Sequence, residues 1–322
     1  MPTVTLPESA KLSQDMLISG LIESIVTVNR SYQVFPFADI EGNALGYNRE
    51  NSLGPVATVG VGDADGSIGS GASGTNSTER AAAKNAATFT QVTSSLTTIM
   101  GDAEVNGLIQ ATRSDKNDQT GTQVGSKAKS AGRKYQDMLI NGTGTNFTFP
   151  GLLALVPSAQ KVDTGTDGTG LSFAIMDEMM DMVLDKDGQV DYFFMPARTI
   201  RTYMALLRAL GGASIGDVVQ LPDGSSVPAY RGVPLFRNDY IPIDQTKGTG
   251  GAVKTTIFAG TFDDGSFTYG ISGLTAKNAS GLAVEDVGIS ETKDERIYRV
   301  KWYCGMALFS ELGVSAADGI TN

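Results

Sequence analysis

Apolar residues recur at helical spacing in residues 101–142, a segment without proline. Their positions step by four, three, four and three, which places one stripe on one helix face; they are Val124, Ala128, Ala131, Tyr135 and Met138. The pattern predicts a single helix over 101–142 that is buried on one side, with Asp102 as its N-cap. At ~1.5 Å per residue this helix would reach about 60 Å. Its polar middle lacks the apolar heptads of a coiled coil.

The residues before this segment show two other patterns. Leucines and isoleucines at helical spacing predict a first amphipathic helix near the N-terminus; they are Leu17, Leu21 and Ile25. Residues 32–51 are typical of extended chain, and residues 88–101 alternate and are rich in Thr, which is typical of a strand. Residues 60–87 between them are rich in glycine and lack periodicity. We expect a long hairpin-like arm with a flexible tip.

From Ser172 onward, short helical and strand patterns alternate, which predicts an α+β module. Ser172 caps the first helix, Gly188 ends it, and Pro196 lies in the first turn of the second. A hairpin turns at Pro222–Gly224. The predicted elements are helices at 172–188 and 196–212, strands at 191–196, 255–262 and 267–273, and the hairpin at 218–242.

The last predicted element is a strand in residues 295–312. Its apolar residues occupy every second position and therefore share one face; they are Tyr298, Val300, Trp302, Cys304, Met306 and Leu308. Arg299 and Lys301 fall on the opposite face. We expect this strand to pack beside the long helix.

Composition excludes several classes of function. The chain has 322 residues, only 19% of them charged, and a net charge of -10, which disfavours a protein that grips nucleic acid. It has no histidine and a single cysteine, Cys304, so Ser-His or Cys-His nucleophile pairs and zinc sites of imidazole or thiolate are excluded. We therefore expect no enzyme activity, no cofactor and no metal. The sequence also shows no secretory signal and no apolar run that could span a membrane.

Three local motifs suggest chemistry, and each has a simpler explanation. The glycines of GSGASG (residues 69–74) match a dinucleotide fingerprint, but no buried strand precedes them. LDKDGQVD (residues 184–191) resembles a calcium loop whose first and last ligand positions hold apolar residues, so a helix-ending turn is expected. Asp177, Glu178 and Asp181 could act as paired carboxylates, but they lie on one solvated helix face without the aromatic residues that such a cleft usually has, so a solvated surface is expected.

Arg201 and Arg208 lie one heptad apart on one face of their predicted helix, with Arg198 close by. They are either a solvated surface or an ionic contact with the acidic surface of a neighbouring subunit. We keep Arg198, Arg201 and Arg208 as candidate intersubunit contacts.

Four segments together resemble a known family. They are FADIEGNALGYNREN (37–51), GRKYQDMLINGTG with FPGLLALV (132–156), RGVPLFRNDYIP (231–242) and SAADGI (315–320). Their content and order resemble the major capsid protein of tailed bacteriophages, which has the Hong-Kong-ninety-seven-type capsid fold. The resemblance covers essentially the whole chain.

The resemblance implies an α+β fold with four parts. These are an N-terminal arm and helix at 1–38, an extended β-hairpin loop at 39–100, a peripheral domain with a long spine helix at 101–150 and 284–322, and an axial domain at 151–283. It also implies a shell protein that assembles with itself into hexamers and pentamers of an icosahedral head around double-stranded DNA. Portal and scaffolding proteins are expected partners, a decoration protein is a possible one, and no membrane is involved. The protein would be assembled in the host cytoplasm and located in the virion.

Three alternatives stay open. An encapsulin-like nanocompartment shell protein resembles the same fold but encloses enzymes. A carboxylate-dependent hydrolase would use Asp177 or Asp181. A phage tail or fibre component would form rings or tubes. Because the chain starts at Met1 without a long charged helical leader, we expect a separate scaffolding protein rather than a built-in scaffolding domain.

Overall fold

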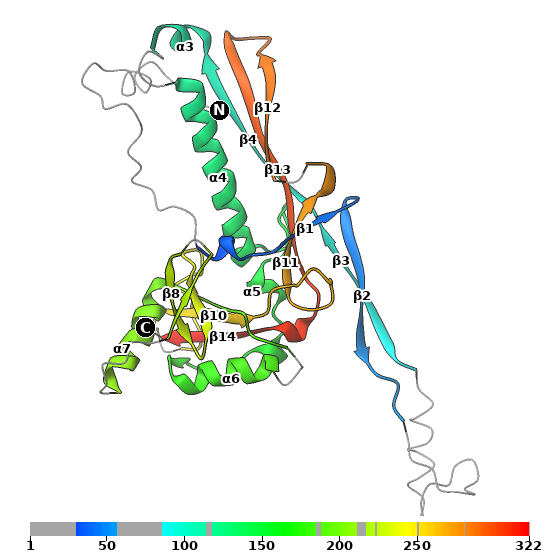
Figure 1. The fold of residues 1–322 in the computed structure, drawn as a ribbon, viewed down its shortest axis with the longest axis vertical. Helices are drawn as coiled ribbons and strands as arrows, with labels where there is room; N and C mark the ends of the chain where they lie inside the picture. The colour runs from blue at the N-terminus through cyan, green and yellow to red at the C-terminus, as the bar shows by residue number, and fades with distance from the viewer. Residues whose placement is uncertain are drawn as a thin grey trace, which may run out of the picture. The chain divides into compact units, whose positions relative to one another are not determined.

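A computed structural model describes most of the chain in two compact units (Figure 1). The described residues are 30–56, 86–113, 118–184, 188–210, 217–222, 224–249, 251–279 and 281–321. The described residues within 45–94, which are 45–56 and 86–94, form the smaller unit, and the other described residues form the larger one. The predicted N-terminal helix and residues 60–85 of the glycine-rich segment, GSGASG included, lie outside the described residues.

A five-stranded sheet is built around one long strand, β13, as the alternation in residues 295–312 predicted. β13 pairs with β4 along one edge and with β12 and then β11 along the other, all antiparallel, and β1 joins β11 in parallel. The strands are β1 (Phe37–Ile40), β4 (Thr97–Asn106), β11 (Ile271–Ala276), β12 (Leu282–Ile289) and β13 (Glu295–Leu308). β12 was not anticipated from the sequence, and β11 begins later than its predicted strand.

The long helix is shorter than predicted. Residues 101–106 continue strand β4, where Ala103 and Val105 are buried, and the helical residues that follow form two elements. These are α3 (Gly107–Arg113) and α4 (Gln119–Asn141). The single helix over 101–142 is therefore wrong, because pairing with β13 stabilises the extended form of residues 97–106. Asp102 is not a cap either: the Asp118 carboxylate caps α4 by accepting from the N–H groups of Thr120 and Gly121.

The predicted stripe on α4 does face the core. Ala131, Tyr135 and Met138 are buried, and Val124 and Ala128 pack against the same cluster. α4 lies along β4 and β13 (Figure 1), so the expectation that the last strand packs beside the long helix is confirmed.

The larger unit also contains a seven-stranded sheet, whose strand order is β5-β14-β10-β6-β9-β8-β7. Its strands are β5 (Thr169–Gly170), β6 (Tyr192–Met195), β7 (Val218–Gln220), β8 (Ser226–Tyr230), β9 (Val233–Arg237), β10 (Lys254–Gly260) and β14 (Val314–Thr321). The associated helices are α5 (Leu152–Leu155), α6 (Phe173–Leu184) and α7 (Ala197–Ala209). Single 3₁₀ turns are η1 (Arg30–Gln33), η2 (Ser158–Gln160), η3 (Lys277–Ala279) and η4 (Glu311–Gly313). The predicted α+β class is confirmed.

This sheet is covered on both faces, which explains why β6 and β10 are buried at every position. Tyr192 and Phe194 of β6 join the cluster that contains α4 and β13. Phe193 and Met195 point to the other side, where they join the cluster that contains the α6 methionines Met176 and Met179. Strands buried on both faces are expected where helices or a second layer cover each side.

The smaller unit is a two-stranded ribbon of β2 (Ala44–Ser52) and β3 (Thr88–Ser95). The Asn51 amide donates to the Thr90 hydroxyl at 2.5 Å, and the hydroxyls of Ser52 and Thr88 lie 2.7 Å apart. Residues 45–52 and 88–94 thus form the paired stem that the sequence predicted for the extended loop.

Opposite charges pair across the strands of the five-stranded sheet. The Arg299 guanidinium donates to both Asp102 oxygens at 2.8 and 2.9 Å, and these residues are directly opposite in the register. Lys301 pairs with Glu285 of β12 on the other side. Such cross-strand pairs add to sheet stability. The hydrogen bond and charge of Arg299 hold the pKa of the Asp102 carboxyl below its ordinary value.

We expect Asp102→Asn to reduce the free energy of unfolding by about 1 kcal/mol at pH 7. Because the folded pKa is depressed, the ion pair stabilises the protein above the unfolded value of ~3.9 and stops doing so as pH falls through the folded value. The difference between wild type and variant should therefore shrink in strongly acidic buffer. Urea unfolding followed by fluorescence of the single tryptophan measures this. Equal urea midpoints at pH 7 would contradict it.

No helix among the described residues combines the length and the apolar character that crossing a membrane requires.

Candidate functional site

The three candidate contact arginines lie on α7, whose inner side is anchored to the seven-stranded sheet. Tyr203 is buried, and its hydroxyl donates to the Ala229 carbonyl at 2.9 Å. Arg201 and Arg208 are exposed, and Arg198 is half-buried. Within the described residues none of these three arginines forms an ion pair. They are therefore available cations on one outer helix surface, and their role in contacts between copies stays a prediction.

The carboxylates of α6 lie on the outer side of that helix. The Asp177 carboxylate accepts from the Tyr230 hydroxyl at 2.8 Å and from Arg231 at 3.0 Å. Glu178 and Asp181 are exposed. Burial and the Asp177 hydrogen bond raise the pKa of Tyr230. Asp177 is thus engaged in a surface ion pair, and this arrangement favours a structural role for it.

Other predicted features can also be placed. Gly188 follows α6, and its N–H donates to the Val183 carbonyl, as a helix-ending turn requires; Asp185 and Asp187 lie outside the described residues. Cys304 is buried, and burial raises the pKa of its thiol to about 12, so it packs as a small apolar residue. Among the described residues no group of three His, Cys, Asp or Glu side chains could hold a metal ion.

Apolar side chains remain on the surface of β12, the outermost strand beside β13. Four of them are exposed: Leu282 by 39%, Val284 by 48%, Val287 by 50% and Ile289 by 72%. An edge strand with exposed apolar residues is a site where another chain can bind. The alternation of Leu282 and Val284 was the signal in the sequence that could have identified this strand.

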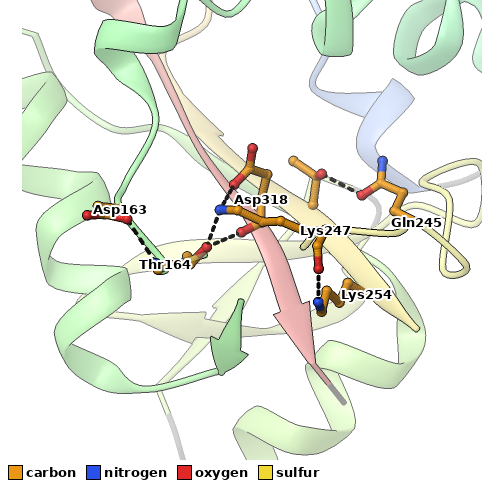
Figure 2. A network of polar contacts seen from close by, with 8 residues as sticks. Asp163, Thr164, Gln245, Lys247, Lys254 and Asp318 are labelled. Atoms are coloured by element: carbon orange, nitrogen blue, oxygen red, sulfur yellow. Dashed lines mark hydrogen bonds and ion pairs between the residues drawn. The ribbon is translucent and has the colours of Figure 1, made fainter. Parts of the chain in front are cut away.

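A polar hollow of about 340 Å³ lies beside β10 and β14. Lys247 is one of its lining residues, and in Figure 2 the ammonium group of Lys247 donates to the Asp318 carboxylate at 2.5 Å and to the Thr164 hydroxyl at 2.6 Å. The Lys254 ammonium donates to the Lys247 carbonyl, and the Gln245 amide oxygen accepts from Thr256 at 2.7 Å. These residues come from separate segments of the sequence, and no sequence motif predicted that they would lie together.

Comparison with known proteins places this architecture among shell proteins. The structure matches the holo-SrpI encapsulin complex of Synechococcus elongatus PCC 7942 with a TM-score of 0.69 and 18% identity, over 99% of this chain and 97% of that one. It matches a structure from Microbacterium phage Oxtober96 with a TM-score of 0.59 and 15% identity, over 99% of both chains. It matches the capsid of a native GTA particle with a TM-score of 0.57 and 14% identity, over 95% of this chain and 96% of that one.

These identities establish the fold alone, and they confirm the predicted capsid fold. A search of curated protein sequences gave no match. The family model for the type 2A encapsulin shell protein, SrpI-like, matches residues 109–320, from α3 to β14. Because this match covers more than half of the 322 residues, the chain belongs to the SrpI-like family of type 2A encapsulin shell proteins.

Proposed function

We propose that this protein is the structural subunit of a closed compartment that encloses protein cargo. Copies of the chain would associate into hexamers and pentamers, and these would close into an icosahedral shell. The observation that carries the proposal is the family match over residues 109–320. On this proposal the protein is not an enzyme itself and needs no cofactor.

The surface of the chain supports self-association. Exposed apolar side chains on β12, and Leu53 and Phe89 of the smaller unit at 77% and 67% exposure, would be covered by neighbouring copies. The low share of charged residues, 19%, agrees with a surface that is largely used for contacts. Repeated contacts between different patches on identical chains close into rings when the rotation between copies allows it.

A second candidate, a phage head around double-stranded DNA, is favoured by the fold shared with the phage chain and the GTA capsid. In that case portal and scaffolding proteins would be partners, a decoration protein could join them, and the protein would reside in the virion. As the subunit of a cargo compartment, it would reside in the cytoplasm of the cell that makes it. The net charge of -10 suits either content, because an acidic wall does not hold DNA by charge.

Electron microscopy and sedimentation velocity of the purified chain test the proposal. Closed shells of one uniform size, formed from this chain alone and free of DNA, would support the compartment. Shells that require a separate scaffolding protein, with tubes or irregular particles in its absence, would favour the phage head. A stable 33.7 kDa monomer at high concentration would overturn both.

The arginine surface of α7 offers a more local test. We expect the double variant Arg201→Glu with Arg208→Glu to lower the yield of shells at least tenfold, because reversed charges at a contact repel and the effect repeats in every copy. Arg201→Lys with Arg208→Lys keeps the charges and should assemble like wild type. Circular dichroism checks that both variants fold. Normal assembly of the Glu variant would exclude this surface as a contact.

A further inference from the structure

Three lysines converge on the polar hollow beside β10 and β14. Lys254 is the first residue of β10, Lys247 lies in the loop before it, and Lys161 follows η2. All three line the hollow, whose volume of about 340 Å³ is large compared with the ~30 Å³ that a water molecule occupies in the liquid. The hollow can therefore hold a small molecule.

Lys254 is the unusual member of this cluster because its side chain is only 1% exposed. Its ammonium group donates to the backbone carbonyl of Lys247. Within the part of the chain that the structure describes, no carboxylate forms an ion pair with Lys254. A buried ammonium without a counter-ion is costly, so a nearby anion would stabilise it.

The other charges around the hollow do not provide that anion. Asp318 is the single carboxylate among the described lining residues, and its oxygen lies 2.5 Å from the Lys247 ammonium. Lys161 also lacks an ion pair within the described residues. The nearby Asp163 carboxylate accepts from the Gly165 N–H at 2.8 Å, outside the lining (Figure 2). The residues that line the hollow thus include three lysines and one aspartate, an excess of two positive charges in a chain whose net charge is -10.

We infer that this hollow binds a phosphate group. A phosphate carries between one and two negative charges at neutral pH and has several acceptor oxygens, which matches the excess of two ammonium groups among the lining residues. The hollow is also lined by apolar residues, Leu153, Val156 and Phe258, which leave room for an organic substituent. The ligand is therefore either inorganic phosphate or a small phosphate monoester. The inference concerns one chain and does not depend on what the shell encloses.

Equilibrium dialysis at constant ionic strength tests this site with two probes, inorganic phosphate and glycerol 3-phosphate. We expect saturable binding of one molecule per chain to the purified protein. Tighter binding of the monoester would identify the organic substituent as part of the ligand, and equal or weaker binding would identify free phosphate. Lys254→Met should weaken binding at least tenfold, and Lys161→Met several-fold.

Lys277→Met is the matched control, because Lys277 is 57% exposed, pairs with Glu41 and lies outside the hollow. It removes the same charge and should bind like wild type. If Lys254→Met does not fold, Lys161→Met decides, since Lys161 is half-buried and forms no ion pair with another described residue, so its replacement breaks none. Absence of saturable binding to wild type, or equal weakening by Lys161→Met and Lys277→Met, would overturn the inference.

Discussion

Gly151→Ala is expected to lower the free energy of unfolding by about 3 kcal/mol, at the upper end of the usual effect of overpacking. A Cβ atom at Gly151 would lie 2.6 Å from the Met138 carbonyl oxygen and 2.7 Å from both the Gly142 nitrogen and the Ile140 carbonyl oxygen. All three are backbone atoms, so no side-chain rotation relieves the contact. The φ of Gly151 is -88°, which alanine adopts without strain, and the expected loss therefore comes from the close approach alone.

This close approach connects the end of α4 to α5. The Gly151 N–H donates to the Gly142 carbonyl at 2.8 Å, and the Leu155 N–H donates to the Gly151 carbonyl at 3.0 Å. The turn thus fixes where the chain leaves the long helix. An alanine that pushes it away would also disturb Leu152, which is fully buried.

Gly125→Ala provides the control, because it is the same chemical change within α4. A Cβ atom at Gly125 would meet nothing within 4 Å. Alanine is the better helix former by up to ~1 kcal/mol, so this variant should be more stable than wild type. Urea unfolding of both variants should give midpoints that move in opposite directions. A shift of the same sign in both would refute the steric argument at Gly151.

The elements predicted best from the sequence are those whose pattern of apolar residues can be recognised within the element itself. The stripe on α4 is one example, because apolar residues recur every three or four positions when one face of a helix is buried along its length. Strand β13 is another: Val300, Cys304 and Met306 are buried as predicted. In its second half, Gly305 and Ala307 are buried too, since layers cover both faces there, and simple alternation could not predict this.

The error at residues 101–106 has a different origin. The segment lacks proline and β-branched runs, so local propensity permitted a helix. The alternation of the buried residues Ala103 and Val105 favours a strand only when β13, about 200 residues later, supplies the hydrogen bonds of the ladder. Strand propensity depends on such partners more than helix propensity does.

The polar hollow could not be predicted for a related reason. Its charged residues, Lys161, Lys247, Lys254 and Asp318, are isolated in the sequence and meet only because β14 lies between β5 and β10. A lysine at the start of an apolar strand is normally expected to point to solvent. Complete burial of Lys254 is a property of the assembled sheet.

Tyr135→Ala is expected to lower the free energy of unfolding by about 3–5 kcal/mol, as for other large aromatic residues removed from a core. Tyr135 is 1% exposed and lies where α4 meets the five-stranded sheet. Its ring centroid is 4.7 Å from that of Trp302, 5.5 Å from that of Phe149 and 5.6 Å from that of Phe37. Its removal would leave a cavity between three aromatic rings that belong to separate segments of the chain.

Tyr135→Phe separates the ring from the hydroxyl. The hydroxyl donates to the Gly305 carbonyl at 3.3 Å, a long hydrogen bond whose loss should cost about 1 kcal/mol or less. The Ala variant should also change the emission of Trp302, the single tryptophan, in the folded protein, whereas the Phe variant should not. If Phe destabilised as much as Ala, the hydroxyl rather than the ring would hold α4 on the sheet. Because every copy in a shell would have the same weakened contact between α4 and the five-stranded sheet, the Ala variant should also assemble poorly at temperatures where wild type forms shells.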